Sequence, residues 1–164
     1  MPGPNKPFRV LFVCMGNICR SPAADVVMRE LVARQRLNDQ IEVDSAGTIG
    51  YHRGNGPDPR MAATLARRGY LPTGSARQVV VGDFDEFDLV LAMDDDNLRD
   101  LNELTRLPEH REKIRRFTEF CRHHQASAVP DPYYGGDDGF EDVADLIEDG
   151  AHGLLAWISE RLPG

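Results

Sequence analysis

The chain has 164 residues, of which 41% are hydrophobic, and this length is sufficient for one domain with a buried core. Its 27 acidic and 19 basic residues give a formal net charge of -8, which argues against nucleic acid or an anionic membrane as the main partner. The opening residues MPGPNKP contain no apolar signal stretch, and no apolar run reaches the roughly 18 residues of a membrane span. We therefore expect a cytoplasmic protein with a loose tail over residues 1–7 and a single domain over residues 8–164, while signal-less export stays open.

The first strand and helix are expected near the N-terminus. Residues 9–14, RVLFVC, form a continuous apolar run that is typical of a strand buried on both faces. Ser21 is suited to cap the following helix, with Pro22 at its first position. The core-facing side of that helix recurs at helical spacing in Ala24, Val27, Met28, Leu31 and Val32.

A second strand and helix follow. Residues 41–48 alternate and then break at Gly47, which predicts a strand, and residues 49–57 are rich in Gly, Asn and Pro, as in a loop. Asp58 and Pro59 then open a helix that Gly69 closes.

The second half of the chain repeats this alternation. Residues 87–94 predict a third buried strand, and the acidic residues 94–96 suit the start of the next helix. Residues 113–120 predict a weaker fourth strand. The C-terminal helix is marked by an apolar stripe at helical period, formed by Phe140, Val143, Ala144, Ile147, Ala151, Leu154, Leu155 and Ile158.

Strands that alternate with helices predict a three-layer α/β domain with a parallel sheet. In such sheets ligands bind beyond the carboxyl ends of the strands. Cys14 ends the first predicted strand, so the chemistry is expected at that edge.

The segment CMGNICRS, which begins at Cys14, combines a thiol with the parts of an anion site. Its loop N–H groups and the following helix N-terminus point to one place, and such a positive pocket favours the thiolate. Gly16 permits close backbone approach, Asn17 tolerates a left-handed conformation, and Arg20 offers a planar fork of donors that matches phosphate oxygens. A cysteine alone is more often a small buried hydrophobe, but this context favours a nucleophile that cleaves phosphate esters.

The other cysteines have less certain roles. Cys19 is either a packing residue of the loop or a redox partner that protects Cys14 as a reversible disulfide. Cys121 lies near His123 and His124, but the spacing does not suit zinc, so we expect no metal. An odd number of three cysteines argues against a disulfide framework and fits a reducing compartment.

Asp131, in VPDPYYGG, is the candidate proton donor for a leaving oxygen. Pro130 and Pro132 stiffen the chain around it, and Tyr133 and Tyr134 offer faces for an aromatic ring. Without the first motif, a plain turn with exposed tyrosines would be the better interpretation.

From about residue 8 to the C-terminal helix, the chain resembles the low-molecular-weight protein tyrosine phosphatases. CMGNICRS resembles their phosphate loop and DPYY their general-acid motif, and VDSAGT, GNGPDPR, ARQ and MDDDNLRDL match further family segments in order. The resemblance implies a flavodoxin-like fold with a four-stranded parallel sheet and no metal or organic cofactor. It also implies that the substrates are phosphotyrosine proteins and small aryl phosphates, and that the site binds phosphate and other oxyanions.

The same resemblance implies residue roles. Cys14 would form a cysteinyl-phosphate, Asp131 would protonate the leaving phenolate and then activate water, and Arg20 would hold the phosphoryl oxygens together with the loop N–H groups. The further implied contacts are Met15, Gly16, Asn17, Ile18 and Cys19 in the loop, Ser21 at the sulfur, Ser45 with Asn17 as loop support, and Tyr51, Tyr133 and Tyr134 as cleft walls.

One departure and three rivals remain. TGSARQ has Gly74 and Ser75 where many relatives have a histidine that supports the loop asparagine, so that support must come from elsewhere, such as Ser45 or water. Arsenate reduction on this fold needs two further cysteines, but after Cys19 the chain has only Cys121. Phosphoarginine hydrolysis is the second rival, but arginine-specific relatives carry threonine where this chain has the apolar Ile18, which suits a phenyl ring better. A non-catalytic phosphate-binding or redox-sensing module would not need Asp131.

Overall fold

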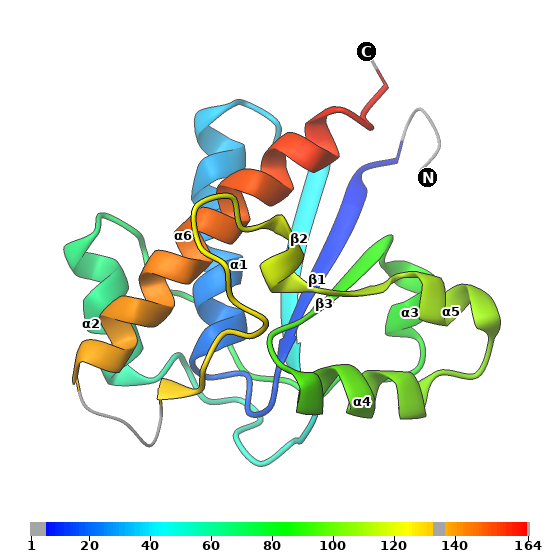
Figure 1. Ribbon diagram of the computed structural model, residues 1–164, viewed down its shortest axis with the longest axis horizontal. Coiled ribbons are helices and arrows are strands. Elements are labelled where there is room, and N and C mark those ends of the chain that lie inside the picture. The colour runs from blue at the N-terminus through cyan, green and yellow to red at the C-terminus, as the bar shows by residue number, and fades with distance from the viewer. Residues whose placement is uncertain (1–5, 133–136, 164) are drawn as a thin grey trace.

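The computed structural model describes residues 6–132 and 137–163, and its elements form three layers (Figure 1). In chain order the elements are β1 (Phe8–Cys14), α1 (Arg20–Arg34), β2 (Ile41–Gly47), α2 (Pro59–Arg67), α3 (Asp83–Glu86), β3 (Leu89–Ala92), α4 (Asp95–Leu104), α5 (Pro108–Glu112), β4 (Ile114–Arg116), the 3-10 helix η1 (Phe117–Phe120) and α6 (Asp137–Ser159). The four strands pair in parallel in the order β2-β1-β3-β4. The predicted α/β class and four-stranded parallel sheet are confirmed.

The sheet separates two apolar clusters because successive strand residues face opposite sides. Val10 and Phe12 of β1 pack in the larger cluster, with α1 and α6, while Leu11 and Val13 pack in the smaller one. Figure 1 shows α1, α2 and α6 on one side of the sheet and α3, α4 and α5 on the other. Both faces of β1 are covered, which explains its unbroken apolar sequence.

Several predicted boundaries hold. Asp58 caps α2, and its carboxylate accepts hydrogen bonds from the N–H groups of Arg60 (2.8 Å) and Met61 (3.4 Å). Gly69 follows α2 with φ of 88°, a conformation that glycine adopts without strain. All eight residues of the predicted C-terminal stripe are buried on α6.

Two predictions are wrong in detail. Ser21 does not cap α1, because the helix begins at Arg20 after Cys19 and has no side-chain cap hydrogen bond. The predicted fourth strand spans only Ile114–Arg116, and the chain then turns into η1. No helix in the described part of the chain is long and apolar enough to cross a membrane.

Candidate active site

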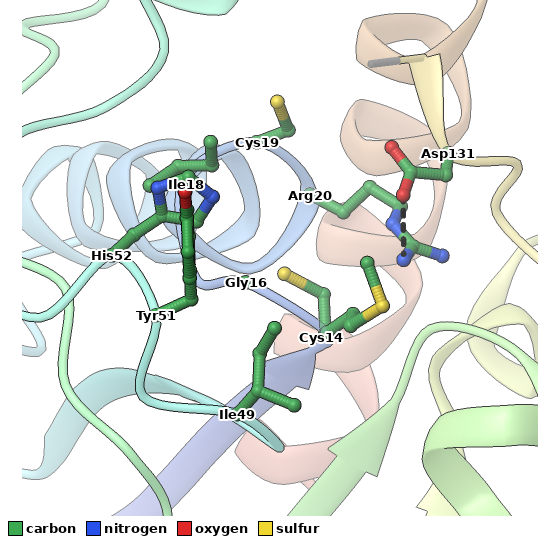
Figure 2. Close-up of a pocket in the computed structure, with 10 residues that line it drawn as sticks. Cys14, Gly16, Ile18, Cys19, Arg20, Ile49, Tyr51, His52 and Asp131 are labelled. Carbon is green, nitrogen blue, oxygen red and sulfur yellow. Dashed lines mark ion pairs between the residues drawn. The ribbon is translucent and has the colours of Figure 1, made fainter. Parts of the chain in front are cut away.

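A cavity of about 180 Å³ opens at the carboxyl end of β1. Figure 2 shows the residues that line it, which are Cys14, Met15, Gly16, Ile18, Cys19, Arg20, Ile49, Tyr51, His52 and Asp131. Segments far apart in the sequence therefore meet at one place, with Cys14 and Arg20 from the first loop and Asp131 from the chain before α6. Ile49 was not singled out in the sequence, and His52 stood there only as one of several residues near Tyr51 that could tune specificity and could not be ranked.

The loop between β1 and α1 turns carbonyl groups away from the pocket. Hydrogen bonds of 2.8–3.1 Å join these carbonyls to backbone N–H groups outside the loop, Cys14 to Thr48, Met15 to Ile49 and Ile18 to Asp58. In a planar trans peptide, the C=O of one residue and the N–H of the next point in opposite directions. The N–H groups of Met15, Gly16 and Cys19 therefore face the concave side of the loop, where they can bind an oxyanion.

Asn17 holds the middle of this loop in a left-handed conformation, with φ of 59°. Its amide nitrogen donates to the hydroxyls of Ser21 (2.8 Å) and Ser45 (3.0 Å), and its oxygen accepts from Arg77 N–H (2.9 Å). The structure thus brings Asn17 and Ser45 together. Arg77 belongs to the ARQ segment and takes part through its backbone, which no side-chain pattern could indicate.

Cys14 is buried at the end of β1, with its sulfur 3.0 Å from the Ser21 hydroxyl oxygen. This contact explains why Ser21 does not cap α1, because its hydroxyl is engaged by the thiol and by Asn17 instead. A hydroxyl at this distance can donate a hydrogen bond to an ionised sulfur.

Arg20 is buried and held by groups from the end of β3 and from the chain between η1 and α6. Its Nη1 donates to Asp94 Oδ2 (2.6 Å) and to the Val129 carbonyl (3.0 Å), while Nη2 lies 3.6 Å from Asp131 Oδ2. Burial lowers the pKa of Arg20, but the negative charges at Cys14, Asp94 and Asp131 outweigh burial and raise it. The guanidinium therefore stays charged, and its contacts with Asp94 and Val129 hold it in the cavity that Cys14 also lines.

Asp94 is a functional residue that sequence reasoning placed only at a helix start. Its Oδ1 accepts from Asn97 N–H at 2.8 Å as the N-cap of α4, and its Oδ2 pairs with Arg20. The acidic run 94–96 indicates the start of α4, but the pairing of Asp94 with Arg20 depends on the order of strands in the sheet.

Cys19 lies in the same loop and is also buried. Burial, with a smaller contribution from the Asp58 carboxylate, raises the pKa of the Cys19 thiol. Figure 2 shows its sulfur directed away from Cys14. A disulfide between the two therefore requires the Cys19 side chain to turn.

The walls of the pocket are apolar and aromatic. Tyr51 is 84% exposed, and its ring meets that of His52 edge-on at 4.9 Å between centroids. His52 in turn covers Gly16, where a Cβ would come within 3.0 Å of the imidazole. Met15 and Ile49 add exposed apolar surface at the rim. The predicted wall residues Tyr133 and Tyr134 lie outside the described residues.

Gly47, at the end of β2, supports the loop from behind. An added Cβ would lie 2.7 Å from the Met15 carbonyl oxygen and 3.1 Å from the Gly16 carbonyl carbon. Only a residue without a side chain allows this approach. The end of β2 thereby fixes the position of the first loop peptides.

Comparison with known proteins agrees with this geometry. Residues 9–163 match the family model described as low molecular weight phosphotyrosine protein phosphatase. A putative low molecular weight protein-tyrosine-phosphatase of Synechocystis is 45% identical over 94% of this chain and 98% of its own. The low molecular weight protein-tyrosine-phosphatase of Streptomyces coelicolor is 43% identical over 96% of this chain and 97% of its own. The crystal structure of a protein tyrosine phosphatase from Entamoeba histolytica, with Hepes in the active site, superposes with a TM-score of 0.90 at 41% identity, covering 93% of this chain and 97% of that one. Over nearly its whole length, in sequence and in fold, the chain belongs to the low molecular weight phosphotyrosine protein phosphatase family.

Proposed function

We propose that this phosphatase hydrolyses phosphotyrosine in proteins, and small aryl phosphates, through a cysteinyl-phosphate on Cys14. The observation that carries the proposal is the convergence of a thiol, a buried guanidinium and a carboxylate on one cavity, beside a loop whose carbonyls are turned away from it. Oxyanion binding by this loop and a cytoplasmic location belong to the same proposal, and three free cysteines support the latter.

In the first step the Cys14 thiolate attacks phosphorus and the bond from phosphorus to the phenol oxygen breaks. Asp131 transfers its proton to that leaving oxygen. The loop N–H groups and Arg20 stabilise the charge on the three equatorial oxygens, and Asp94 and Val129 hold Arg20 in place for this.

In the second step water attacks phosphorus and the sulfur–phosphorus bond breaks. Asp131 accepts the proton of the water, which restores the acid for the next turnover. The hydroxyl of Ser21, 3.0 Å from the sulfur, donates to the departing thiolate. All bonds and protons are thereby accounted for without a further reactant.

Phosphoarginine hydrolysis is the second candidate. Ile18 and Ile49 line the cavity and present apolar surface, which suits a phenyl ring better than a guanidinium. We expect kcat/KM to be higher for a phosphotyrosine peptide than for the matching phosphoarginine peptide. Arsenate reduction is disfavoured because Cys121, the third cysteine, is absent from the cavity lining and bonds to the Leu146 carbonyl.

Two variants test the assignment. Cys14→Ser should abolish turnover of p-nitrophenyl phosphate and leave the circular dichroism spectrum unchanged, with Cys121→Ser as the active control. Asp131→Asn should lower kcat/KM for phenyl phosphate by about 100-fold and affect better leaving groups less. The exposed Asp96→Asn serves as its control. Wild-type kinetics of Asp131→Asn with phenyl phosphate would show that the acid is another residue.

A further inference from the structure

Asp149 of α6 anchors the chain that connects η1 to Asp131, which we call the acid segment (residues 121–131). Its side chain is 4% exposed. The two carboxylate oxygens accept three consecutive backbone N–H groups, from Arg122 (2.8 Å), His123 (3.0 Å) and His124 (2.8 Å), and Oδ2 also lies 2.7 Å from His124 Nδ1. Burial raises the pKa of Asp149, but these hydrogen bonds outweigh it and lower the value to about 2. The anchor is therefore charged throughout the physiological range.

The packing next to Asp149 places this anchor firmly. Gly150 and Gly153 lie on the same part of α6. A Cβ added at Gly150 would collide with the Phe117 ring, and one added at Gly153 would collide with the Phe120 carbonyl oxygen. The 3-10 turn η1 therefore rests directly on the helix backbone. In Figure 1 the yellow acid segment leaves η1 and runs beside α6 before it reaches the site.

The far end of the acid segment is tied to the catalytic loops. Val129 donates its N–H to the Met93 carbonyl at 2.8 Å and accepts from Arg20 Nη1 at 3.0 Å. Asp131 follows two residues later, and Pro132 is buried near Gly139 of α6. Between the two anchors lie only residues 125–128, each exposed or half-buried.

We propose that Asp149 is a positioning residue for the general acid: by holding the start of the acid segment on α6, it sets where Asp131 stands relative to the scissile oxygen. This inference rests on the proposed role of Asp131. A carboxylate that only stabilised the fold would affect all substrates alike. A positioning role affects the substrates whose leaving group needs a proton.

The experiment compares phenyl phosphate, which has a poor leaving group, with 2,4-dinitrophenyl phosphate, which has a good one. For Asp149→Asn we expect kcat/KM to fall about tenfold with phenyl phosphate, since a small misplacement from a remote change can cost as much as about 100-fold. With dinitrophenyl phosphate we expect kcat/KM to remain within about twofold of wild type.

Two controls separate positioning from general damage. Glu148→Gln is the matched variant, because the carboxylate of this neighbouring residue is engaged by Tyr70 and Arg68 after α2 instead of by the backbone of the acid segment. It should leave the ratio of kcat/KM for phenyl phosphate to kcat/KM for dinitrophenyl phosphate unchanged. In the double variant Asp131→Asn with Asp149→Asn, the ratio should match that of Asp131→Asn alone, because an absent acid cannot be misplaced further.

The outcomes are distinct. If Asp131→Asn lowers the ratio and Asp149→Asn does not, the positioning role is overturned and the proposed function stands. If Asp131→Asn itself leaves the ratio unchanged, the acid assignment fails first. Should Asp149→Asn not fold, Asp149→Glu keeps the charge but lengthens the side chain that holds the three backbone N–H groups, and a wild-type ratio in that variant overturns the inference.

Discussion

Replacing Gly47 with alanine changes the contact between the end of β2 and the phosphate loop without touching any side chain of the site. The new Cβ would lie 2.7 Å from the Met15 carbonyl oxygen, and 3.1 Å from both the Gly16 carbonyl carbon and the Ile49 carbonyl oxygen. All three neighbours are backbone atoms, so none can move aside by rotating a side chain. An ordinary contact needs several tenths of an ångström more, and the loop must supply that shift.

The shift would pass directly to the loop N–H groups that we propose bind the phosphoryl oxygens. The Met15 carbonyl is bonded to Ile49 N–H at 3.1 Å, and the Cys14 carbonyl to Thr48 N–H at 2.9 Å, so the loop moves with this end of the sheet. Overpacking of this kind lowers the free energy of unfolding by about 1–3 kcal/mol. Displaced donors should lower kcat/KM by roughly 10- to 100-fold.

Urea unfolding measures the first effect, and turnover of p-nitrophenyl phosphate with inhibition by inorganic phosphate measures the second. Gly56→Ala is the control, since a Cβ there would meet only the Gly74 carbonyl oxygen at 4.0 Å. It should be close to neutral in both assays. A Gly47→Ala enzyme with wild-type kcat/KM and phosphate affinity would refute the claim that β2 fixes the loop.

Three further results are expected. Asp94→Asn keeps an N-cap for α4 but removes the charge nearest Arg20. Urea unfolding should show a loss of about 1–3 kcal/mol, because the buried guanidinium loses its closer carboxylate partner; unchanged stability would contradict this. The lowered pKa of Asp149 contributes stability that is fully present above the ordinary pKa of 3.8 and is lost as the pH falls toward about 2. The free energy of unfolding of wild type should therefore exceed that of Asp149→Asn by about 2 kcal/mol at neutral pH, and this difference should vanish in acid. A pH-independent difference would count against the ionised anchor. Mild peroxide should oxidise Cys14 and link it to Cys19, whereas a peptide map with only sulfinic acid at Cys14 would exclude protection by Cys19.

The elements that the sequence predicted correctly are those whose signal is local. A few neighbouring residues are enough to indicate burial or capping in three places, which are the apolar run of β1, the Asp58–Pro59 start of α2 and the apolar stripe of α6. Cys14, Gly16 and Arg20 could be expected at one cavity for the same reason, because the loop that carries them is short and continuous.

The failures have tertiary causes. Ser21 has the side chain of a helix cap, but the sulfur of Cys14 and the amide of Asn17 compete for its hydroxyl. The fourth strand ends early because Phe117 and Phe120 turn onto the glycines of α6, a contact between distant segments. Contacts of this kind are set by the packing of layers, and no local pattern records them.

The same distinction applies to the site. Asp131 could be found because prolines flank it, but the pairing of Asp94 with Arg20 arises only when β1 and β3 lie side by side. The backbone of Arg77 meets Asn17 through the bridge between Gly47 and Gln78. These supporting residues need the sheet order, which the sequence does not state directly.

The outward-turned carbonyls of the phosphate loop have a consequence for how this enzyme can diversify. In the proposed mechanism main-chain amides and Arg20 supply the donors, so the side chains of Met15 and Ile18 take no part in the chemistry. Substitutions there can alter which molecules are admitted while the reaction itself is conserved. New substrate selectivity can thus arise by single replacements at the entrance of the cavity, without changes to Cys14, Arg20 or the backbone of the loop.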